Sequence, residues 1–423
     1  MGWFFFYVPF VGPACSKFCL IRRYTPRSLI KIRLSRWEPV SYTHLDVSKR
    51  QVQHAVDYVV VAPDDPLALG MVDALAEKGI PAFGPGKAAA RIEASKVFSK
   101  DLMKKYGIPT ARYEAFSDAE SARAYIRAQG KYPVVVKADG LALGKGVLIC
   151  EDEAAAMAAV KSMMEDGAFG ASGSRLVVEE FLTGPEVSVL SFTDGQTVVP
   201  MVSSMDHKRA LDGDRGLNTG GMGTIAPNPC YTPELAQACM RTIFQPTIEA
   251  MRAEGCPFRG CLYFGLMLTP DGPKVIEYNC RFGDPETQVV LPLLDGDLLE
   301  IMQATTNGTL AGVPVKWKAA SAACVVLASG GYPQKYESGK LITGLVNGQL
   351  PGGGATVFHA GTKLEDGGLV TAGGRVLGVT AVAETLQAAV KAAYAAAENI
   401  HFEGMHMRSD IGARALAAGK EGN

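Results

Sequence analysis

The chain has 423 residues, of which 48% are hydrophobic and 20% are charged, a balance that is ordinary for a soluble globular protein. One hydrophobic core rarely grows to this length, so we expect about two to four domains. The formal net charge of -1 gives no reason to expect nucleic acid or an acidic membrane as a partner. The nine cysteines have no zinc-type spacing and indicate reduced thiols, which predicts a cytoplasmic protein.

Residues 1–53 do not match the rest of the chain. The apolar run at 3–8 is far too short to span a bilayer, and the basic residues after it resemble no cleavable signal. A membrane anchor and an amphipathic targeting peptide are alternatives, although prolines interrupt any long helix. The run PVSYTHLDVSKRQ is similar to translated adaptor sequence. We therefore expect 1–53 to replace the native start of the protein and to contain no packed element.

The next segment is predicted to be the remnant of a Rossmann-like domain, residues 54–93. A valine-rich run at 58–62 is typical of a buried parallel strand, and residues 80–84 are expected to form a second strand. Between these strands we expect a turn at 63–67 and a helix at 69–78, which a glycine ends.

Residues 132–147, YPVVVKADGLALGKGV, combine a strand with a glycine-rich hairpin. The three valines predict a buried strand, so the Lys137 ammonium group emerges at its end, where it can reach a phosphate. The hairpin could bring backbone N–H groups onto phosphate oxygens, through Gly140, Gly144, Lys145 and Gly146. The spacing is not that of a Walker loop, because strands rather than a helix are expected to follow. A purely structural turn is the alternative.

A second glycine-rich segment follows Asp206-His207-Lys208-Arg209. We expect residues 212–223 to form an exposed loop that, with Lys208 and two nearby arginines, could cradle an anion. A flexible surface loop without a ligand is the alternative. His207 is either a general base or a hydrogen-bonded loop histidine.

The spacing of apolar residues predicts the remaining elements. A long helix is expected at 232–254 and a core strand at 260–268, which forms a hairpin with the strand after it. Another helix begins at Leu298. A small β-rich domain then contains, in order, strands at 319–328, 356–360 and 375–380 and an alanine-rich helix at 386–400.

The most informative stretch is residues 274–288, KVIEYNCRFGDPETQ. A period of two places Glu277 and Asn279 on one face of a short strand, with Arg281 following on the same side. A carboxylate and an amide oxygen offer Mg²⁺ a partial site that it can share with nucleotide phosphates. In the turn that follows, Arg281 can grip an anion beside the carboxylate of Asp284. The alternative is an ordinary strand end with a solvated charge cluster.

The run RFGDPETQ at 281–288 resembles the signature of the glycinamide ribonucleotide synthetase family, ATP-grasp ligases of purine synthesis. A match of this length without a substitution is specific. The runs D-H-K-R, N-T-G-G-M-G and G-G-Y-P are also similar to family sequences, and the resemblance extends from residue 54 to about the C-terminus. The family normally begins with a strand and a G-S-G-G-R-E-H turn, which does not occur here.

The resemblance implies an α/β and α+β multidomain protein with an ATP-grasp fold. The N-terminal Rossmann-like domain would be truncated, and the C-terminal domain would be small and β-rich. The implied divisions are an atypical segment at 1–53, the Rossmann-like remnant at 54–93, the ATP-grasp domain at 94–318 with a lid subdomain at about 116–184, and the C-terminal domain at 319–423.

The implied reaction joins glycine to 5-phosphoribosylamine through a glycyl phosphate, giving glycinamide ribonucleotide, ADP and phosphate. The implied cofactors are ATP and Mg²⁺ or Mn²⁺, the implied partners are the two small substrates, and we expect a monomer. By resemblance the metal ligands are Glu277 and Asn279, and the catalytic residues are Arg281, Asp284 and Lys208. The implied nucleotide-binding residues are Lys96, Lys137, Gly140, Gly144, Lys145, Gly146, Glu179, Glu180, Leu182 and Glu186.

Two other functions stay open. A carboxylase of the biotin carboxylase type has the same ATP-grasp fold, although the runs RFGDPE and D-H-K-R favour the ligase. A catalytically impaired nucleotide-binding chain is the second alternative, because the missing N-terminal turn lies near the phosphoribosylamine site in the family.

Overall fold

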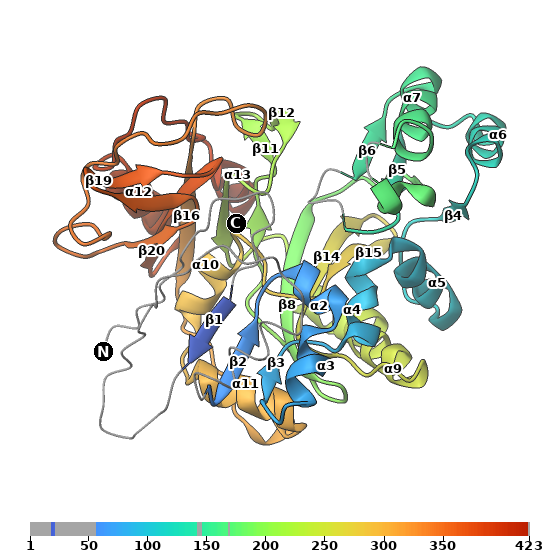
Figure 1. Ribbon diagram of the computed structural model, residues 1–423, viewed down its shortest axis with the longest axis horizontal. Helices are drawn as coiled ribbons and strands as arrows, with labels where there is room; N and C mark the ends of the chain where they lie inside the picture. Colours follow the sequence, from blue (N-terminus) through green and yellow to red (C-terminus); the bar gives the residue numbers. More distant parts are fainter. Residues whose placement is uncertain (1–17, 22–55, 142–145, 168–169, 422–423) are drawn as a thin grey trace.

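The computed structural model of the protein describes residues 18–21, 56–141, 146–167 and 170–421. Figure 1 shows a central sheet with an N-terminal region beside it, a lid on one side and a C-terminal region on the other. The mixed α/β multidomain class predicted from the sequence is confirmed. Within the described residues, no helix has the length and apolarity needed to cross a membrane.

The N-terminal region is built around the parallel pair β2 (Tyr58–Val61) and β3 (Ala82–Phe83). All four residues of β2 are buried, as a valine-rich run predicts. The prediction of no packed element in 1–53 is wrong at one place, because β1 (Phe18–Ile21) pairs antiparallel with β2. The rest of that segment lies outside the described residues.

The predicted turn at 63–67 is wrong, because α2 (Asp64–Leu69) forms there. Acidic residues in its first turn interact favourably with the helix N-terminus, and Pro66 lies where the missing N–H has no intrahelical partner. The helix predicted at 69–78 is shorter, α3 (Met71–Ala76), because Gly70 ends α2 in the left-handed conformation with φ of 97°.

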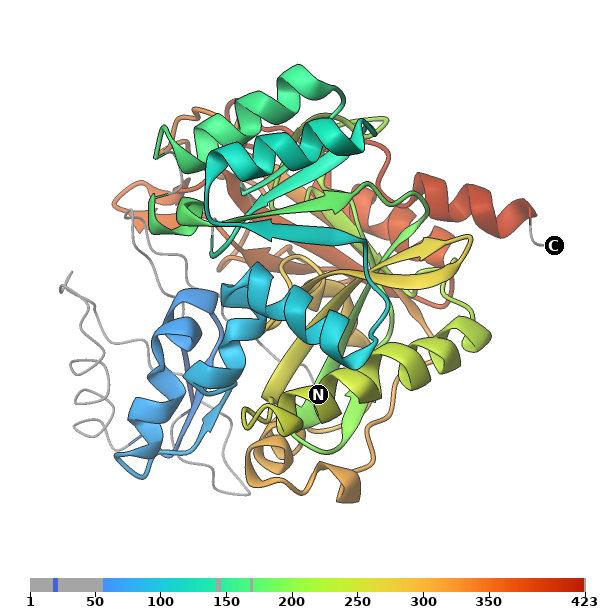
Figure 2. The same ribbon diagram turned by 90° about the vertical axis from the view of Figure 1, so that its right-hand side faces the viewer.

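The lid contains an antiparallel sheet in the order β4-β7-β5-β6. Its hairpin from β5 to β6 agrees with the prediction that strands rather than a helix follow Lys137. Figure 2 shows the two lid helices, in teal and green, lying over one face of this sheet. The lid elements are β4 (Tyr113–Phe116), α6 (Ala119–Gln129), β5 (Val134–Ala138), β6 (Val147–Cys150), α7 (Glu153–Met164), the 3-10 turn η1 (Gly170–Ser174) and β7 (Leu176–Glu180). Two helices join the N-terminal region to the lid, α4 (Lys87–Ala94) and α5 (Lys96–Tyr106).

The central sheet has the order β15-β14-β8-β9 and is antiparallel throughout. The predicted core strand at 260–268 is confirmed as β14, and the long helix at 232–254 is confirmed as a continuous run with one π-helical turn, η2. The elements are β8 (Glu186–Asp194), β9 (Val198–Pro200), α8 (Pro233–Cys239), η2 (Met240–Phe244), α9 (Gln245–Ala253), β14 (Arg259–Thr269), β15 (Gly272–Asn279), α10 (Thr287–Val290), η3 (Leu291–Leu293), α11 (Leu298–Asn307) and η4 (Leu310–Gly312).

The C-terminal region contains an antiparallel sheet in the order β10-β13-β16-β20-β17, and α12 packs on β16 and β20. Two of its strands, β10 and β13, come from a part of the chain predicted to lie in the preceding domain. The elements are β10 (Met205–Asp206), β13 (Gly223–Ala226), β16 (Ser321–Ala328), β17 (Thr356–His359), β18 (Thr362–Glu365), β19 (Gly368–Thr371), β20 (Arg375–Ala383), α12 (Leu386–Ala397) and α13 (Ala413–Glu421).

The segment between β10 and β13 is not the open loop that its glycines predicted. It forms a two-stranded hairpin, β11 (Arg209–Leu211) and β12 (Arg215–Asn218), which Figure 1 shows projecting from the C-terminal sheet. Glycine at 213 and 216 adopts positive φ and allows the tight reversal, so a glycine-rich sequence here encodes a hairpin rather than an unstructured loop.

Candidate functional site

A buried carboxylate joins the lid to the central sheet. Glu179, at the end of β7, has an exposed fraction of 3% and lies 3.0 Å from the Nζ of Lys137 on β5. Lys137 also donates to the carbonyl oxygen of Ile276 on β15, at 3.1 Å. Because the neighbouring strand ends bring these groups together, the ammonium group of Lys137 lies beside the strand that carries Glu277.

The second partner of Glu179 is Lys100, a residue that the sequence reasoning did not select. Its Nζ lies 2.8 Å from Glu179 Oε2, and burial lowers its pKa to about 8 although Glu179 acts in the opposite direction. Lys96, one turn earlier on α5, donates to the carbonyl oxygen of Gly140 at 2.9 Å, and burial lowers its pKa too. The spacing of four residues between the two lysines was the available signal for a shared helix face.

The glycine-rich hairpin of the lid begins at Gly140, whose φ is 130°. A Cβ atom at this position would lie 2.5 Å from Ser172 Oγ, so a side chain has no room. At the other end of the hairpin, the carbonyl oxygen of Gly146 accepts from the backbone N–H of Ala138 at 2.9 Å. Gly144 and Lys145 lie outside the described residues.

The other three nucleotide-binding candidates lie between the last residue of β7 and the first residue of β8. Glu180 is held by Arg112, whose Nε lies 2.7 Å from its carboxylate; burial raises the pKa of Glu180, but the hydrogen bonds from Arg112 outweigh it and the pKa is lowered. Leu182 is half-buried in the linker between β7 and β8. Glu186, the exposed first residue of β8, lies 3.4 Å from Lys208 Nζ and therefore beside the D-H-K-R run.

Glu277 lies among cations on β15. Lys208 Nζ is 3.7 Å from its carboxylate, and burial would raise the pKa of Glu277, but the charges of Lys208, Lys137 and Lys96 hold it below its usual value. In return, Glu186 and Glu277 raise the pKa of Lys208 against the effect of burial. Glu277 is therefore ionised next to three ammonium groups.

The donor set fits a hard cation. Glu277 and Asn279 stand two residues apart on β15, opposite Gly265 and Tyr263 of β14 in the sheet register, so both side chains leave the same face. One is an ionised carboxylate and the other supplies an amide oxygen, which are ligands that Mg²⁺ and Mn²⁺ accept.

Arg281 is anchored by Glu93 of α4, another residue that the sequence reasoning missed. Its Nη2 lies 3.3 Å from Glu93 Oε1 and 3.5 Å from Asn279 Oδ1. The second oxygen of Glu93 accepts from the backbone N–H of Cys280 at 2.6 Å, although burial raises the pKa of this carboxyl group. Glu93 thereby fixes the backbone of Cys280 and the side chain of Arg281, where the turn that follows β15 begins.

Asp284 lies in that turn and is held from the C-terminal sheet. Arg375 Nη2 donates to its carboxylate at 2.9 Å, and Gln288 Nε2 donates to the other oxygen at 2.8 Å. Arg375 was expected only as the first residue of a strand. Nothing in the local pattern distinguishes it, because its partner is 91 residues away in sequence.

Two further carboxyl groups are buried below the turn. Burial, together with the charge of Glu286, raises the pKa of Asp206 well above its usual value, and burial also raises the pKa of Glu286. Tyr263 donates to Glu286 Oε1 at 3.2 Å and shares a hydrogen bond of 2.7 Å with Ser188. Each of these two carboxyl groups therefore takes up a proton more readily than an exposed carboxyl group does.

Of the two roles considered for His207, its environment favours a hydrogen-bonded loop histidine over a general base. It is buried, its Nδ1 contacts the carbonyl oxygen of Gly223 at 3.2 Å, and its Nε2 accepts from the backbone N–H of Gly412 at 3.1 Å. Burial and the nearby charge of Arg408 lower its pKa to about 4. The neutral ring is therefore a bridge between β13 and the C-terminal segment.

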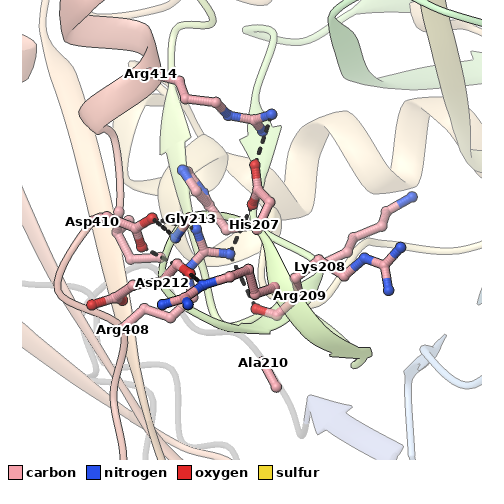
Figure 3. Close-up of polar contacts among 12 residues, drawn as sticks. His207, Lys208, Arg209, Ala210, Asp212, Gly213, Arg408, Asp410 and Arg414 are labelled. Atoms are coloured by element: carbon pink, nitrogen blue, oxygen red, sulfur yellow. Dashed lines mark hydrogen bonds and ion pairs between the residues drawn. The ribbon is translucent and has the colours of Figure 1, made fainter.

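Figure 3 shows how arginines of the C-terminal region hold the hairpin that follows Lys208. Arg408, with an exposed fraction of 1%, binds Asp410 at 2.7 Å and Asp214 at 3.0 Å, and it also donates to the carbonyl oxygen of Arg209 at 3.1 Å. Arg414 lies 2.8 Å from the other oxygen of Asp214. The hairpin is therefore fixed at its tip as well as at its base.

Three family profiles match consecutive parts of the chain. Residues 32–93 match the Phosphoribosylglycinamide synthetase N domain, residues 94–287 the Phosphoribosylglycinamide synthetase ATP-grasp (A) domain, and residues 322–414 the Phosphoribosylglycinamide synthetase C domain. The predicted division of the chain stays a prediction, although the match to the N domain begins within the segment that was expected to be atypical.

Similar proteins agree with the profiles. A phosphoribosylamine–glycine ligase of Allochromatium vinosum is 49% identical over 366 residues, which are 86% of this chain and 85% of the relative. The crystal structure of the phosphoribosylamine–glycine ligase of Thermotoga maritima is 40% identical, with a TM-score of 0.72 over 78% of this chain and 81% of that one. Biotin carboxylase of Campylobacter jejuni gives a TM-score of 0.69 over 86% of this chain and 79% of that one, but at 16% identity it shows the fold alone. The predicted ATP-grasp fold is confirmed.

We expect His207 to make the protein sensitive to mild acid. The pKa of the ring is about 4 in the fold against 6.5 for an ordinary histidine, so the unfolded chain binds the proton first and stability falls as the pH drops from 6.5 to 4. At about 1.4 kcal/mol per pKa unit, the loss is about 3 kcal/mol. Urea unfolding at pH 7, 5 and 4 of the wild type and of His207→Gln measures it. The variant should be less stable at pH 7, and a difference that stays constant down to pH 4 would contradict the assignment.

We expect Arg408→Met to lower the free energy of unfolding by about 3 kcal/mol, because it leaves carboxylates without their buried partner. The matched control is Arg414→Met, whose side chain is 63% exposed and also pairs with Asp214. That exposed pair should contribute less than about 1 kcal/mol. Thermal unfolding of both variants compares them, and similar small losses would show that Arg408 does not hold the hairpin.

Proposed function

Because this chain belongs to the phosphoribosylglycinamide synthetase family and joins glycine to 5-phosphoribosylamine in purine biosynthesis, we propose a role in that reaction for each residue of the site. The reaction consumes ATP and gives glycinamide ribonucleotide, ADP and phosphate. The carboxylate of glycine is a poor acyl donor, so its activation as a glycyl phosphate is the step that ATP drives. The observation that carries the proposal is the ionised Glu277 surrounded by lysines at the junction of the lid and the central sheet.

The lysines bind the nucleotide phosphates in this proposal. Lys137 and Lys96 come from the lid strand and from α5, and their ammonium groups neutralise charge on the phosphates as point charges. Glu179 and Lys100 hold Lys137 in place rather than touching the nucleotide, since both Glu179 oxygens are already bound. Gly140 and the hairpin after it cover the phosphates with backbone N–H groups.

The adenosine end of ATP occupies the linker between β7 and β8. Glu180, Leu182 and Glu186 follow one another from the lid sheet to the central sheet, and an extended backbone there can hydrogen-bond to the adenine base. Glu186 is exposed, so its carboxylate is accessible to ribose hydroxyl groups.

Glu277 and Asn279 would hold the metal ion, either Mg²⁺ or Mn²⁺, which would supply positive charge for phosphoryl transfer. These two residues keep ionised and neutral oxygens on one face, and Lys208 stands opposite them at 3.7 Å from Glu277. Electrostatic stabilisation of this kind needs charges that are already in place before the reaction.

Arg281 and Asp284 orient glycine and the acceptor amine. In the first step, a carboxylate oxygen of glycine attacks the γ-phosphorus and ADP leaves. In the second step, the amine of phosphoribosylamine attacks the carbonyl carbon, the bond to phosphate breaks and the amine loses a proton. Lys208 stabilises the charge that passes between the phosphoryl and carboxyl groups, and holding the reactants in position supplies much of the rate.

The protein acts as a monomer in the cytoplasm in this proposal. The cysteines that the structure describes with side chains are free, which supports a reducing compartment.

We expect Glu277→Ala to lower glycine-dependent ADP release by at least roughly 100-fold, because it removes preorganised charge from the phosphoryl-transfer site. The fold should remain intact, since a half-exposed carboxylate contributes little to packing. The matched control is Asp271→Ala, an exposed carboxylate in the turn of the same β14–β15 hairpin. Circular dichroism checks the fold of both variants, and full activity of Glu277→Ala would remove this residue from the site.

The proposed function is tested by ADP release with freshly made phosphoribosylamine. We expect ATP to be consumed only when glycine and phosphoribosylamine are both present, because Arg281 and Asp284 can pair with the two ends of a zwitterion. Replacing the two substrates by bicarbonate and biotin separates the carboxylase alternative. ADP formation with that pair and none with glycine would reject the ligase.

A further inference from the structure

Arg375 is the place where the C-terminal sheet contacts the turn that carries Asp284. It is the first residue of β20, and its side chain is 19% exposed. Nη1 donates to the carbonyl oxygen of Asp284 at 2.9 Å and Nη2 donates to the carboxylate of the same residue at 2.9 Å. One guanidinium group thus binds both the backbone and the side chain of Asp284.

The same guanidinium group holds a second loop. Nη1 also donates to the carbonyl oxygen of Gly220 at 2.6 Å, in the N-T-G-G-M-G run. The backbone N–H of Gly220 donates to the hydroxyl group of Tyr332 at 3.0 Å, and Tyr332 belongs to the C-terminal G-G-Y-P run. Both polar groups of the Gly220 residue are therefore bound by side chains of the C-terminal region.

The loop held in this way lies directly against the turn that carries Asp284. Gly221 has φ of 107°, and a Cβ atom there would lie 2.5 Å from Pro285 Cδ and 2.6 Å from Asp206 Oδ1. The loop has no room to move toward the turn, and Arg375 with Tyr332 prevents it from moving away. Asp284, Gly220 and the buried carboxyl group of Asp206 are thereby kept in one arrangement.

We propose that Arg375 and Tyr332 are positioning residues for the acceptor step, which lock Asp284 and residues 219–221 into the arrangement that receives phosphoribosylamine. The inference rests on the proposed role of Asp284. It adds that the C-terminal region takes part in the reaction through these two side chains. The site is then completed by a domain that contributes none of the residues assigned to ATP or to the metal ion.

An arginine is required here for a geometric reason. Its planar fork reaches three oxygens at once, whereas a lysine is a point charge that cannot replace the bidentate contact. Burial lowers the pKa of Arg375, but the charges of Asp284, Tyr332, Asp206 and Glu286 together raise it above its usual value, so the group stays charged. A lysine at 375 should therefore behave more like an apolar residue than like arginine.

The test compares Arg375→Lys, Arg375→Met and Tyr332→Phe with the control Arg414→Met, an exposed arginine of the same region. A misplaced reacting group costs roughly 100-fold in rate, so kcat/KM for phosphoribosylamine should fall by about that factor in both Arg375 variants. KM for ATP should remain that of the wild type. Tyr332→Phe should show a smaller loss, and Arg414→Met none. A further variant, Arg375→Ala, leaves space for a small ion, and added guanidinium ion at a non-denaturing concentration should restore part of its activity.

Hydrogen exchange gives a readout that does not depend on turnover. Amides at 219–222 should exchange faster in the Arg375 variants and at the wild-type rate in Arg414→Met. If kcat/KM falls equally for ATP and for phosphoribosylamine and the melting temperature also falls, Arg375 has only a structural role and the inference is overturned. Full activity of the Arg375 variants would overturn it too. If the wild type itself releases no ADP with glycine, the proposed function fails, and faster exchange would then show only a structural contact.

Discussion

The buried carboxylate of Glu179 between two lysines is the interaction on which the nucleotide site depends. A buried charge is costly unless it is paired and hydrogen-bonded, and Glu179 meets this condition only because Lys100 and Lys137 reach it from different elements. The same contact extends to β15, because Lys137 also binds the carbonyl oxygen of Ile276. The lid strands, α5 and the central sheet are thus joined at one point, close to Glu277. Removing either lysine would leave the carboxylate underpaired and would also displace the ammonium group proposed to bind phosphate.

The second constraint is that two strands from the middle of the chain belong to the C-terminal sheet. β10 and β13 follow the central strand β9 in the chain, but β13 pairs with β16 and β10 pairs with β13, and the D-H-K-R and N-T-G-G-M-G runs lie at their ends. Two residues of the C-terminal region, Gly412 and Arg408, then fix this segment through buried polar contacts with His207 and with the carbonyl oxygen of Arg209. Lys208 therefore stands between two sheets, one that orients its backbone and one that supplies Glu277 and Glu186 as partners for its charge. Lys208, which we propose to act in catalysis, is thus held by two domains rather than by one.

The sequence predicted the elements whose signals are local. The valine run before Lys137, the core strand β14, and the alternation that places Glu277 and Asn279 on one face depend on neighbours within one strand. The turn at 63–67 and the loop at 212–223 were wrong because Pro and Gly also occur in the first turn of a helix and in tight hairpins. Glu93, Lys100, Arg375 and Arg408 were missed for a different reason. Each makes a contact with a distant part of the chain, 187 residues away for Glu93 and Cys280 and 194 for Arg408 and Asp214, and no period reveals such a pair. Arg408 also binds Asp410, two residues away. The site roles themselves stay predictions, since contacts alone do not identify a ligand.

The charges at the site explain why so many of its residues had to come from distant elements. The three lysines around Glu277 carry like charges that repel one another, and the carboxyl groups of Asp206 and Glu286 already have raised pKa values. Each charge therefore needs a partner outside its own strand: Glu179 for Lys137, Glu186 for Lys208, Glu93 for Arg281 and Arg375 for Asp284. These partners do not need to touch a substrate. Without them, however, the charged side chains proposed to bind ATP and glycine would change their protonation state or their position. The fold can hold unlike charges ready for phosphoryl and acyl transfer because four separate elements neutralise them in pairs.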